Sequence, residues 1–191
     1  MVIGVLAVQG DFSLHEKALQ QLGITTIQVR KPEHLSRCSG LIMPGGESTT
    51  FVKLLKSIGL FEALKHFGKE RVIFGTCAGL ITLATDVVNY PLETLQLIDI
   101  QVERNAYGRQ IDSFVDEVQV TLEGEPFKTE GVFIRAPKIV KVGEGVRVLG
   151  YHKEDIVLAE NEHILVATFH PELTTDYRIH NYFLKKVKAF L

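Results

Sequence analysis

An apolar run at residues 71–74 leads directly into Gly75-Thr76-Cys77-Ala78-Gly79, and no other feature constrains the fold of this chain as much. Glycines two residues before and two residues after the cysteine allow a turn that is too tight for side chains at those positions. We therefore predict a buried strand that breaks sharply into a helix beginning near Ala78, with the thiol at the bend. Because a helix N-terminus stabilises negative charge, Cys77 is a candidate nucleophile. Taken alone, a cysteine beside an apolar run is more often a small core residue.

A second candidate group, His170-Pro171-Glu172, follows the apolar run at residues 164–169. Residues i and i+2 of an extended segment project to the same side, so we expect Glu172 to lie beside His170 and to fix its tautomer. A nucleophile, a base and a carboxylate that orients the base form a complete set for covalent catalysis. Taken singly, His170 is typical of a structural histidine and Glu172 of an exposed charge or a helix cap.

The third candidate group is a glycine turn, Pro44-Gly45-Gly46-Glu47-Ser48, that follows the short apolar strand predicted at residues 40–43. Adjacent glycines at the end of a strand let backbone N–H groups point into a crevice, as the stabilisation of an oxyanion requires. The hydroxyl residues after the turn are suited to capping the next helix. The alternative is an ordinary connection between a strand and a helix.

The arrangement of apolar segments predicts an α/β fold. Apolar strands at residues 2–8, 24–29, 40–43 and 71–74 alternate with helical patterns, which favours a parallel sheet. From residue 97 onward apolar and polar residues alternate, which predicts antiparallel strands with one solvated face. Ser13 with Glu16 fits a capping box for the first helix, Gly23 its end, and Thr174 or Thr175 a cap for the last helix. Ligands of such sheets bind at the carboxyl ends of the strands, where the elbow and the glycine turn should meet.

Composition restricts the possible classes of function. A chain of 191 residues with 46% hydrophobic content suits a single domain over residues 1–191. The net charge of −2 gives no electrostatic basis for binding nucleic acid. Two cysteines are too few for a disulfide framework, and the apolar run at residues 2–8 is too short to span a membrane and lacks a basic leader. We therefore expect a cytoplasmic protein that contacts no membrane, with Cys38 as a bystander thiol. A Walker-type loop and clustered metal-ligand spacings are absent from the sequence, so no cofactor or metal is expected.

The three motifs, in this order and at these separations, resemble the class I (triad) glutamine amidotransferases. Five further segments resemble, more narrowly, the glutaminase subunits of pyridoxal 5'-phosphate synthase. These segments are residues 8–11, 15–16, 102–110, 112–114 and 132–137. The resemblance runs from Gly4 to about Tyr182, and His34 departs from it where glutamine is expected. It implies a three-layer, flavodoxin-like domain with a mostly parallel central sheet and an antiparallel extension.

The resemblance also implies a reaction. Cys77 attacks the side-chain carboxamide of L-glutamine, His170 transfers the proton to the departing ammonia, and water hydrolyses the resulting thioester to L-glutamate. Backbone N–H groups of Gly46 and Ala78 hold the oxyanion. The implied substrate contacts are Gly46, Glu47, Ser48, Arg104, Ile134 and Arg135. Without the resemblance, we would interpret Arg104 as part of a surface ion pair with Glu103 or Asp112, and Arg135 as a charged residue at the end of a strand.

Ammonia is protonated in neutral water and easily lost, so the resemblance further implies a heteromeric complex with the synthase (lyase) subunit that consumes it. The segments near Gln9-Gly10 and His15-Glu16 are the expected docking contacts. Three alternatives remain. One is the glutaminase of another amidotransferase, such as imidazole glycerol phosphate synthase, which the segments around Arg104 and Arg135 disfavour. The others are a cysteine hydrolase acting on peptides or γ-glutamyl conjugates, and a non-catalytic interaction module, which the intact triad disfavours.

Overall fold

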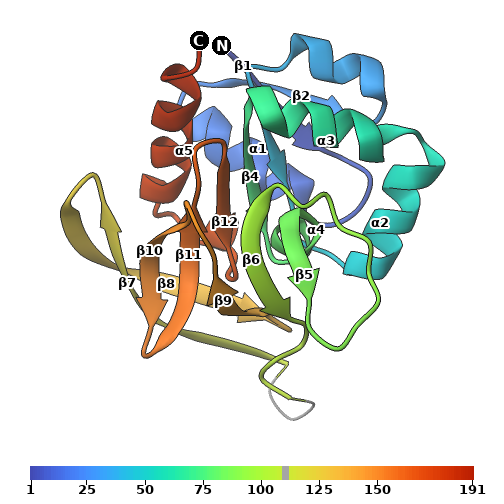
Figure 1. Cartoon of the computed structure of the whole chain (residues 1–191). Coiled ribbons are helices and arrows are strands. Elements are labelled where there is room, and N and C mark those ends of the chain that lie inside the picture. Colours follow the sequence, from blue (N-terminus) through green and yellow to red (C-terminus); the bar gives the residue numbers. More distant parts are fainter. Residues whose placement is uncertain (109–111) are drawn as a thin grey trace.

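A twelve-stranded sheet forms the centre of the computed structural model, which describes residues 1–108 and 112–191 (Figure 1). The strands are β1 Val2–Leu6, β2 Thr25–Val29, β3 Gly40–Met43, β4 Val72–Thr76, β5 Ala84–Val87, β6 Ile98–Glu103, β7 Ser113–Leu122, β8 Glu125–Ile134, β9 Lys138–Val142, β10 Arg147–His152, β11 Asp155–Glu160 and β12 Ile164–Ala167. The helices are α1 Phe12–Gln21, α2 Ser48–Ser57, α3 Leu60–Glu70, α4 Ala78–Leu83 and α5 Arg178–Lys188, with 3-10 helices η1 Pro32–Arg37 and η2 Pro171–Leu173. Arg109 and Gln110, which belong to a segment that carries the resemblance, lie outside the described residues.

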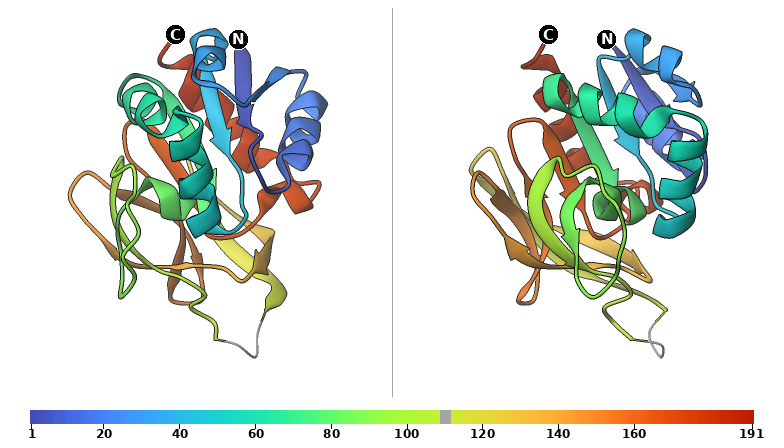
Figure 2. Two further views of the ribbon diagram at one scale, coloured as in Figure 1. Left: turned by 90° about the vertical axis from the view of Figure 1, so that its right-hand side faces the viewer. Right: turned by 45° about the vertical axis from the view of Figure 1, so that its right-hand side comes forward.

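The first half of the sheet is parallel. Its strand order is β2-β1-β3-β4-β12, and each neighbouring pair runs in the same direction. Along β1, Ile3 and Val5 face a core shared with α1 and α5, whereas Leu6 faces a core shared with α2 and α3. Helices therefore cover both faces, as Figure 2 shows, and the predicted three-layer α/β fold is confirmed. The chain order changes direction at β1, which makes the adjoining carboxyl ends a natural ligand crevice.

The second half of the sheet is the expected antiparallel extension. β11 pairs antiparallel with β12, and β10, β7 and β8 follow in order. β9 pairs with both β11 and β6, and β5 joins the edge of β6. Burial alternates along β6, as the polar-apolar pattern predicts. The ends of β6 and β8 carry Arg104, Ile134 and Arg135 toward the carboxyl ends of the parallel strands.

The predicted N-caps of α1, α2 and α5 are wrong, since the N-cap residues are Asp11, Glu47 and Tyr177. Ser13 lies inside α1, whose N-cap is Asp11, and no side chain caps that helix. The side chain of Glu47 caps α2 by accepting from the N–H groups of Thr49 and Thr50, so the neighbouring hydroxyls are not needed there. A carboxylate has two acceptor oxygens and can satisfy two such N–H groups at once.

The last helix starts later than predicted. Thr174 Oγ1 accepts from the N–H of Asp176, and Asp176 Oδ1 accepts from the N–H of Arg178. The segment therefore makes two successive local turns before α5 begins, with Tyr177 at its N-cap. The expected end of α1 is confirmed, since Gly23 follows it with a φ of 72°. Within the described ranges, no helix is long and apolar enough to cross a membrane.

Candidate active site

Cys77 occupies a strained bend between β4 and α4. Its φ of 50° and ψ of −107° are unusual for a residue with a side chain. Such backbone strain costs about 1–3 kcal/mol and is found mainly at functional sites. The N–H of Cys77 donates to Ala167 O at 3.0 Å, which ties the bend to β12.

Close packing around the bend explains its two glycines. A Cβ on Gly75 would lie 2.8 Å from the carbonyl carbon of Gly79, and a Cβ on Gly79 would lie 2.1 Å from Met43 O. Neither position tolerates a side chain, because α4 lies directly against the ends of β3 and β4. The bend predicted from the sequence is thus present, with the positive φ at the cysteine itself.

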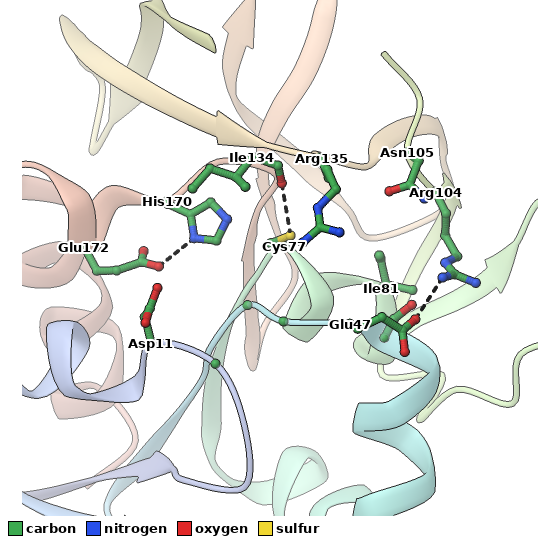
Figure 3. A pocket seen from close by; sticks show the side chains of 14 residues that line it. Asp11, Glu47, Cys77, Ile81, Arg104, Asn105, Ile134, Arg135, His170 and Glu172 are labelled. Carbon is green, nitrogen blue, oxygen red and sulfur yellow. Dashed lines mark hydrogen bonds and ion pairs between the residues drawn. The ribbon is translucent and has the colours of Figure 1, made fainter. Parts of the chain in front are cut away.

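His170 and Glu172 are brought together by a turn rather than by an extended segment. His170 precedes the 3-10 helix η2, and Glu172 lies within it. His170 Nδ1 nevertheless lies 2.7 Å from Glu172 Oε1. Figure 3 marks this contact with a dashed line. The expected contact is present, but the expected backbone conformation is wrong, because Pro171 starts a 3-10 turn here. The N–H of His170 donates to Val132 O and so fastens this residue to β8.

The surroundings of Glu172 and His170 determine the charges of these two side chains. Burial acts to raise the pKa of Glu172, but His15 and His170 outweigh it and lower this pKa to about 2. Burial acts to lower the pKa of His170, but the contacts with Cys77 and Glu172 outweigh burial and raise this pKa above its usual value. Glu172 is therefore ionised at neutral pH and stabilises positive charge on His170.

The glycine turn lies against both catalytic candidates. A Cβ on Gly45 would lie 2.6 Å from His170 Cε1 and 3.4 Å from Cys77 Cβ. Gly46 has a φ of 142°, in the region that favours glycine. Ala78 is the first residue of α4, so its N–H has no acceptor inside the helix.

These residues surround one pocket of about 230 Å³ (Figure 3). It is lined by Gly10, Asp11, Gly45, Gly46, Glu47, Ser48, Cys77, Ile81, Arg104, Asn105, Ile134, Arg135, His170 and Glu172. Drug-sized ligands fill about 300–1,000 Å³, so this pocket fits a smaller molecule. The structure brings every predicted site residue to the pocket except Ala78. Ala78 follows Cys77 in the chain and its side chain is buried.

Charged groups of both signs face the pocket at the end opposite Glu172 (Figure 3). Arg104 Nη2 donates to Glu47 Oε1 at 3.0 Å, and its guanidinium stacks on the Tyr90 ring at 4.1 Å. Partial burial acts to raise the pKa of Glu47, but the N–H groups of Thr49 and Thr50 lower it to about 2. Arg104 thus pairs with Glu47 and not with Glu103 or Asp112. A carboxylate and a guanidinium together complement a zwitterionic amino acid.

Two further features of the pocket concern Arg135 and Ser48. Arg135 has a φ of 41°, a second strained residue at the site. Ser48 Oγ is buried and has no hydrogen-bond partner among the described residues. A buried hydroxyl without a partner is costly, and a bound ligand would relieve that cost.

Sequence reasoning missed the position of His15 beside Glu172. The segment near His15 and Glu16 was expected at a docking surface, but the His15 side chain is fully buried and makes no surface contact. His15 Nε2 lies 3.4 Å from Glu172 Oε2, on the far side of the carboxylate from His170. A signal was available, since His15 shares one face of α1 with Ala18 and Leu19. Asp11, Ile81 and Asn105 also line the pocket without having been predicted as site residues.

Comparison with known proteins identifies close relatives of this chain. The sequence model described as the SNO glutamine amidotransferase family matches residues 5–189. The pyridoxal 5'-phosphate synthase subunit PdxT of Thermosipho africanus is 51% identical over 189 residues, which cover 98% of this chain and 100% of that protein. The protein of the same name from Desulforamulus reducens is also 51% identical, with the same coverage.

A solved structure is also similar to this chain. A crystal structure described as a glutamine amidotransferase superposes with a TM-score of 0.92 at 46% sequence identity. The match covers 98% of this chain and 100% of that one.

Proposed function

Because this chain belongs to the SNO glutamine amidotransferase family, we propose that Cys77, His170 and Glu172 are the triad with which it hydrolyses L-glutamine. The family makes the chain a glutaminase, the ammonia-supplying subunit of a pyridoxal 5'-phosphate synthase. The observation that carries the triad assignment is the meeting of the Cys77 bend with the His170–Glu172 pair at one pocket.

The first half of the reaction forms a thioester. His170 Nε2 has no hydrogen-bond partner among the described side chains and backbone groups, so it is available to take the thiol proton. Cys77 Sγ then attacks the carboxamide carbon, and the carbon–nitrogen bond breaks as His170 returns the proton to the departing ammonia. Glu172, fixed on Nδ1, stabilises the imidazolium between these two transfers.

The second half releases L-glutamate. His170 takes a proton from water as the water oxygen attacks the thioester carbon. The carbon–sulfur bond then breaks, and His170 returns the proton to the departing sulfur, which regenerates the Cys77 thiol. Both tetrahedral intermediates carry an oxyanion, for which we assign the N–H groups of Gly46 and Ala78. One such donor contributes about 3 to 4 kcal/mol to transition-state stabilisation.

Substrate binding uses the charged end of the pocket. Arg104 or Arg135 pairs with the α-carboxylate of glutamine and Glu47 with its α-ammonium group. Ser48 Oγ offers an otherwise unused hydrogen bond, and Gly46 and Ile134 supply backbone groups.

The ammonia passes to the synthase (lyase) subunit in a heteromeric complex, in keeping with the relatives named as subunits of that synthase. We retain Gln9 and Gly10 as docking contacts, since Gly10 lines the pocket and both residues lie in the loop between β1 and α1. His15 is excluded as a surface contact by its burial. We place the protein in the cytoplasm.

Glutamate release from L-glutamine in the presence of the synthase subunit tests the proposal. Wild type should release glutamate and ammonia in equal amounts, and Cys77→Ala should lose almost all activity while keeping the thermal unfolding midpoint. A Cys77→Ala variant that retains more than a few per cent of the rate would overturn the nucleophile assignment. Hydrolysis of peptides or γ-glutamyl conjugates in place of free glutamine would favour the alternative hydrolase.

A further inference from the structure

Two buried histidines lie behind the Glu172 carboxylate, outside the pocket. His15 comes from α1 and His180 from α5, and both side chains are 0% exposed. His15 Nε2 lies 3.4 Å from Glu172 Oε2 and 3.3 Å from Thr76 Oγ1. His15 Nδ1 lies 3.1 Å from His180 Nε2. The contacts form a chain from α5 through α1 to the carboxylate that orients His170.

Burial favours the neutral form of both rings. Burial lowers the pKa of His15, against an opposing attraction from Glu172. Burial also lowers the pKa of His180, to about 3. A neutral imidazole carries one N–H and one bare nitrogen, so the contacts decide which nitrogen holds each proton.

Only one arrangement of these protons gives every N–H an acceptor. If His15 carries its proton on Nε2, that proton faces Thr76 Oγ1 at 3.3 Å and Glu172 Oε2 at 3.4 Å, and the bare Nδ1 of His15 accepts from His180 Nε2. The bare nitrogen of His180 is then Nδ1, which has no partner among the described residues. The opposite arrangement turns a lone pair of His15 toward an anionic carboxylate and leaves a buried N–H of His180 without an acceptor, and both are costly.

Glu172 Oε2 is buried and has no hydrogen-bond partner among the described residues, and His15 Nε2 lies 3.4 Å from it. We propose that His15 is a positioning residue for the triad: its Nε2–H attracts this otherwise unpartnered oxygen, and His180 fixes the tautomer that makes this possible. The inference rests on the proposed function, since it assigns a role to residues that act through Glu172. Glu172 lies in a 3-10 turn of three residues, and its Oε1 is the oxygen that contacts His170. Attraction between Oε2 and the Nε2–H of His15 opposes rotation of the carboxylate about its last torsion and so keeps Oε1 in line with His170 Nδ1.

The tautomer is tested on the wild-type protein. Nitrogen NMR of the histidine-labelled chain should show a protonated Nε2 and a bare Nδ1 for both His15 and His180. A His15 ring protonated on Nδ1, or on both nitrogens at neutral pH, would overturn the proposal. This measurement requires no activity and no variant, so it remains decisive if the glutaminase assignment itself fails.

The positioning role is tested with a matched pair of variants. His15→Leu removes the donor at similar size, whereas His15→Gln keeps an amide N–H near the place of Nε2. In the complex with the synthase subunit, His15→Leu should lower kcat about tenfold to a hundredfold with an unchanged KM for L-glutamine, because a small misplacement of a catalytic group has effects of that size. His15→Gln should recover most of the loss. His152→Leu removes another contact between a buried histidine and a carboxylate, that of Asp116, which lies outside the pocket, and should leave kcat unchanged.

A spectroscopic readout separates positioning from general destabilisation. The proton on His170 Nδ1, held against Glu172, should give a downfield proton NMR signal that persists in His15→Gln and is shifted or broadened in His15→Leu. An unchanged signal together with an unchanged kcat in His15→Leu would refute the positioning role. If His15→Leu does not fold, His180→Phe serves instead, since it keeps the ring packing against Phe74 and removes the donor to His15.

Discussion

Arg104 Nη2 lies 3.0 Å from Glu47 Oε1, and this ion pair joins the segment after β6 to the N-terminus of α2 at one end of the pocket. In the binding mode proposed above, the amino acid replaces one charge partner by another, so the existing ion pair orders both side chains before the substrate binds. We therefore assign the pair to substrate recognition and not to the chemistry at Cys77.

We predict that Arg104→Ala raises the KM for L-glutamine about tenfold to a hundredfold with a smaller effect on kcat. A hydrogen bond to a charged group contributes about 1.5–3 kcal/mol, and Arg104 lies away from the reacting carbon. Steady-state kinetics of the complex measure both constants. Lys56→Ala, which breaks the exposed pair with Glu93, is the matched control and should change neither. A fall in kcat at constant KM would contradict the role in binding.

The two thiols should differ sharply in reactivity. Burial raises the pKa of Cys38 to about 11, and its Sγ donates to His34 O, so this thiol stays protonated and covered at neutral pH. Cys77 faces the pocket at a helix N-terminus. Iodoacetamide should therefore modify Cys77 alone and abolish activity, as peptide mass spectrometry would show. Cys38→Ala should keep nearly full glutaminase activity, and modification of Cys38 at a comparable rate would contradict this.

Glu172→Gln should lose less activity than His170→Asn. Glu172 orients and stabilises the base, whereas His170 itself transfers the proton in both halves of the reaction. Steady-state rates of the two variants in the complex decide the ranking. The reverse order would indicate that another group acts as the base.

Stability should fall as the pH is lowered from about 6.5 toward 3. The folded pKa of His180 is about 3 and its ordinary value is 6.5, so in this range the unfolded chain binds the extra proton and the folded chain does not. The His180 contribution is fully present above pH 6.5 and is lost toward pH 3, by up to about 1.4 kcal/mol per pH unit. Urea unfolding at a series of pH values measures the slope. His180→Phe should show a shallower slope, and an identical slope would rule out the buried histidine as its source.

The isolated chain should be a poor glutaminase. Peptides flanked by Gly45 and Gly46 rotate readily, so the Gly46 N–H need not point at the oxyanion until the synthase subunit binds. Loss of one oxyanion donor lowers the rate about a hundredfold to a thousandfold. A glutamate-release assay on the chain alone and with excess synthase subunit measures this directly. Equal rates in the two assays would exclude gating through this turn.

Local features of the sequence predicted the parallel strands, the bend at Cys77 and the change of strand type after residue 97. Apolar runs ending in glycine or in His-Pro predicted the strands, and the switch to alternating polarity from residue 97 predicted the antiparallel extension, because burial on two faces or on one imprints a different periodicity. The spacing around Cys77 similarly predicted the bend, since only glycine fits where α4 meets β3 and β4.

The caps and the surroundings of the triad were decided by tertiary structure. Which group caps α2 depends on Glu47 turning back to Thr49 and Thr50, and the contact between His170 and Glu172 arises from a 3-10 turn that the pair by itself did not predict. The sequence determined that a cysteine, a histidine and a glutamate were candidates for one site. Only the packing of α1 and α5 against β4 brought His15 and His180 behind Glu172, because contacts between residues 165 positions apart depend on the fold as a whole and leave no local pattern.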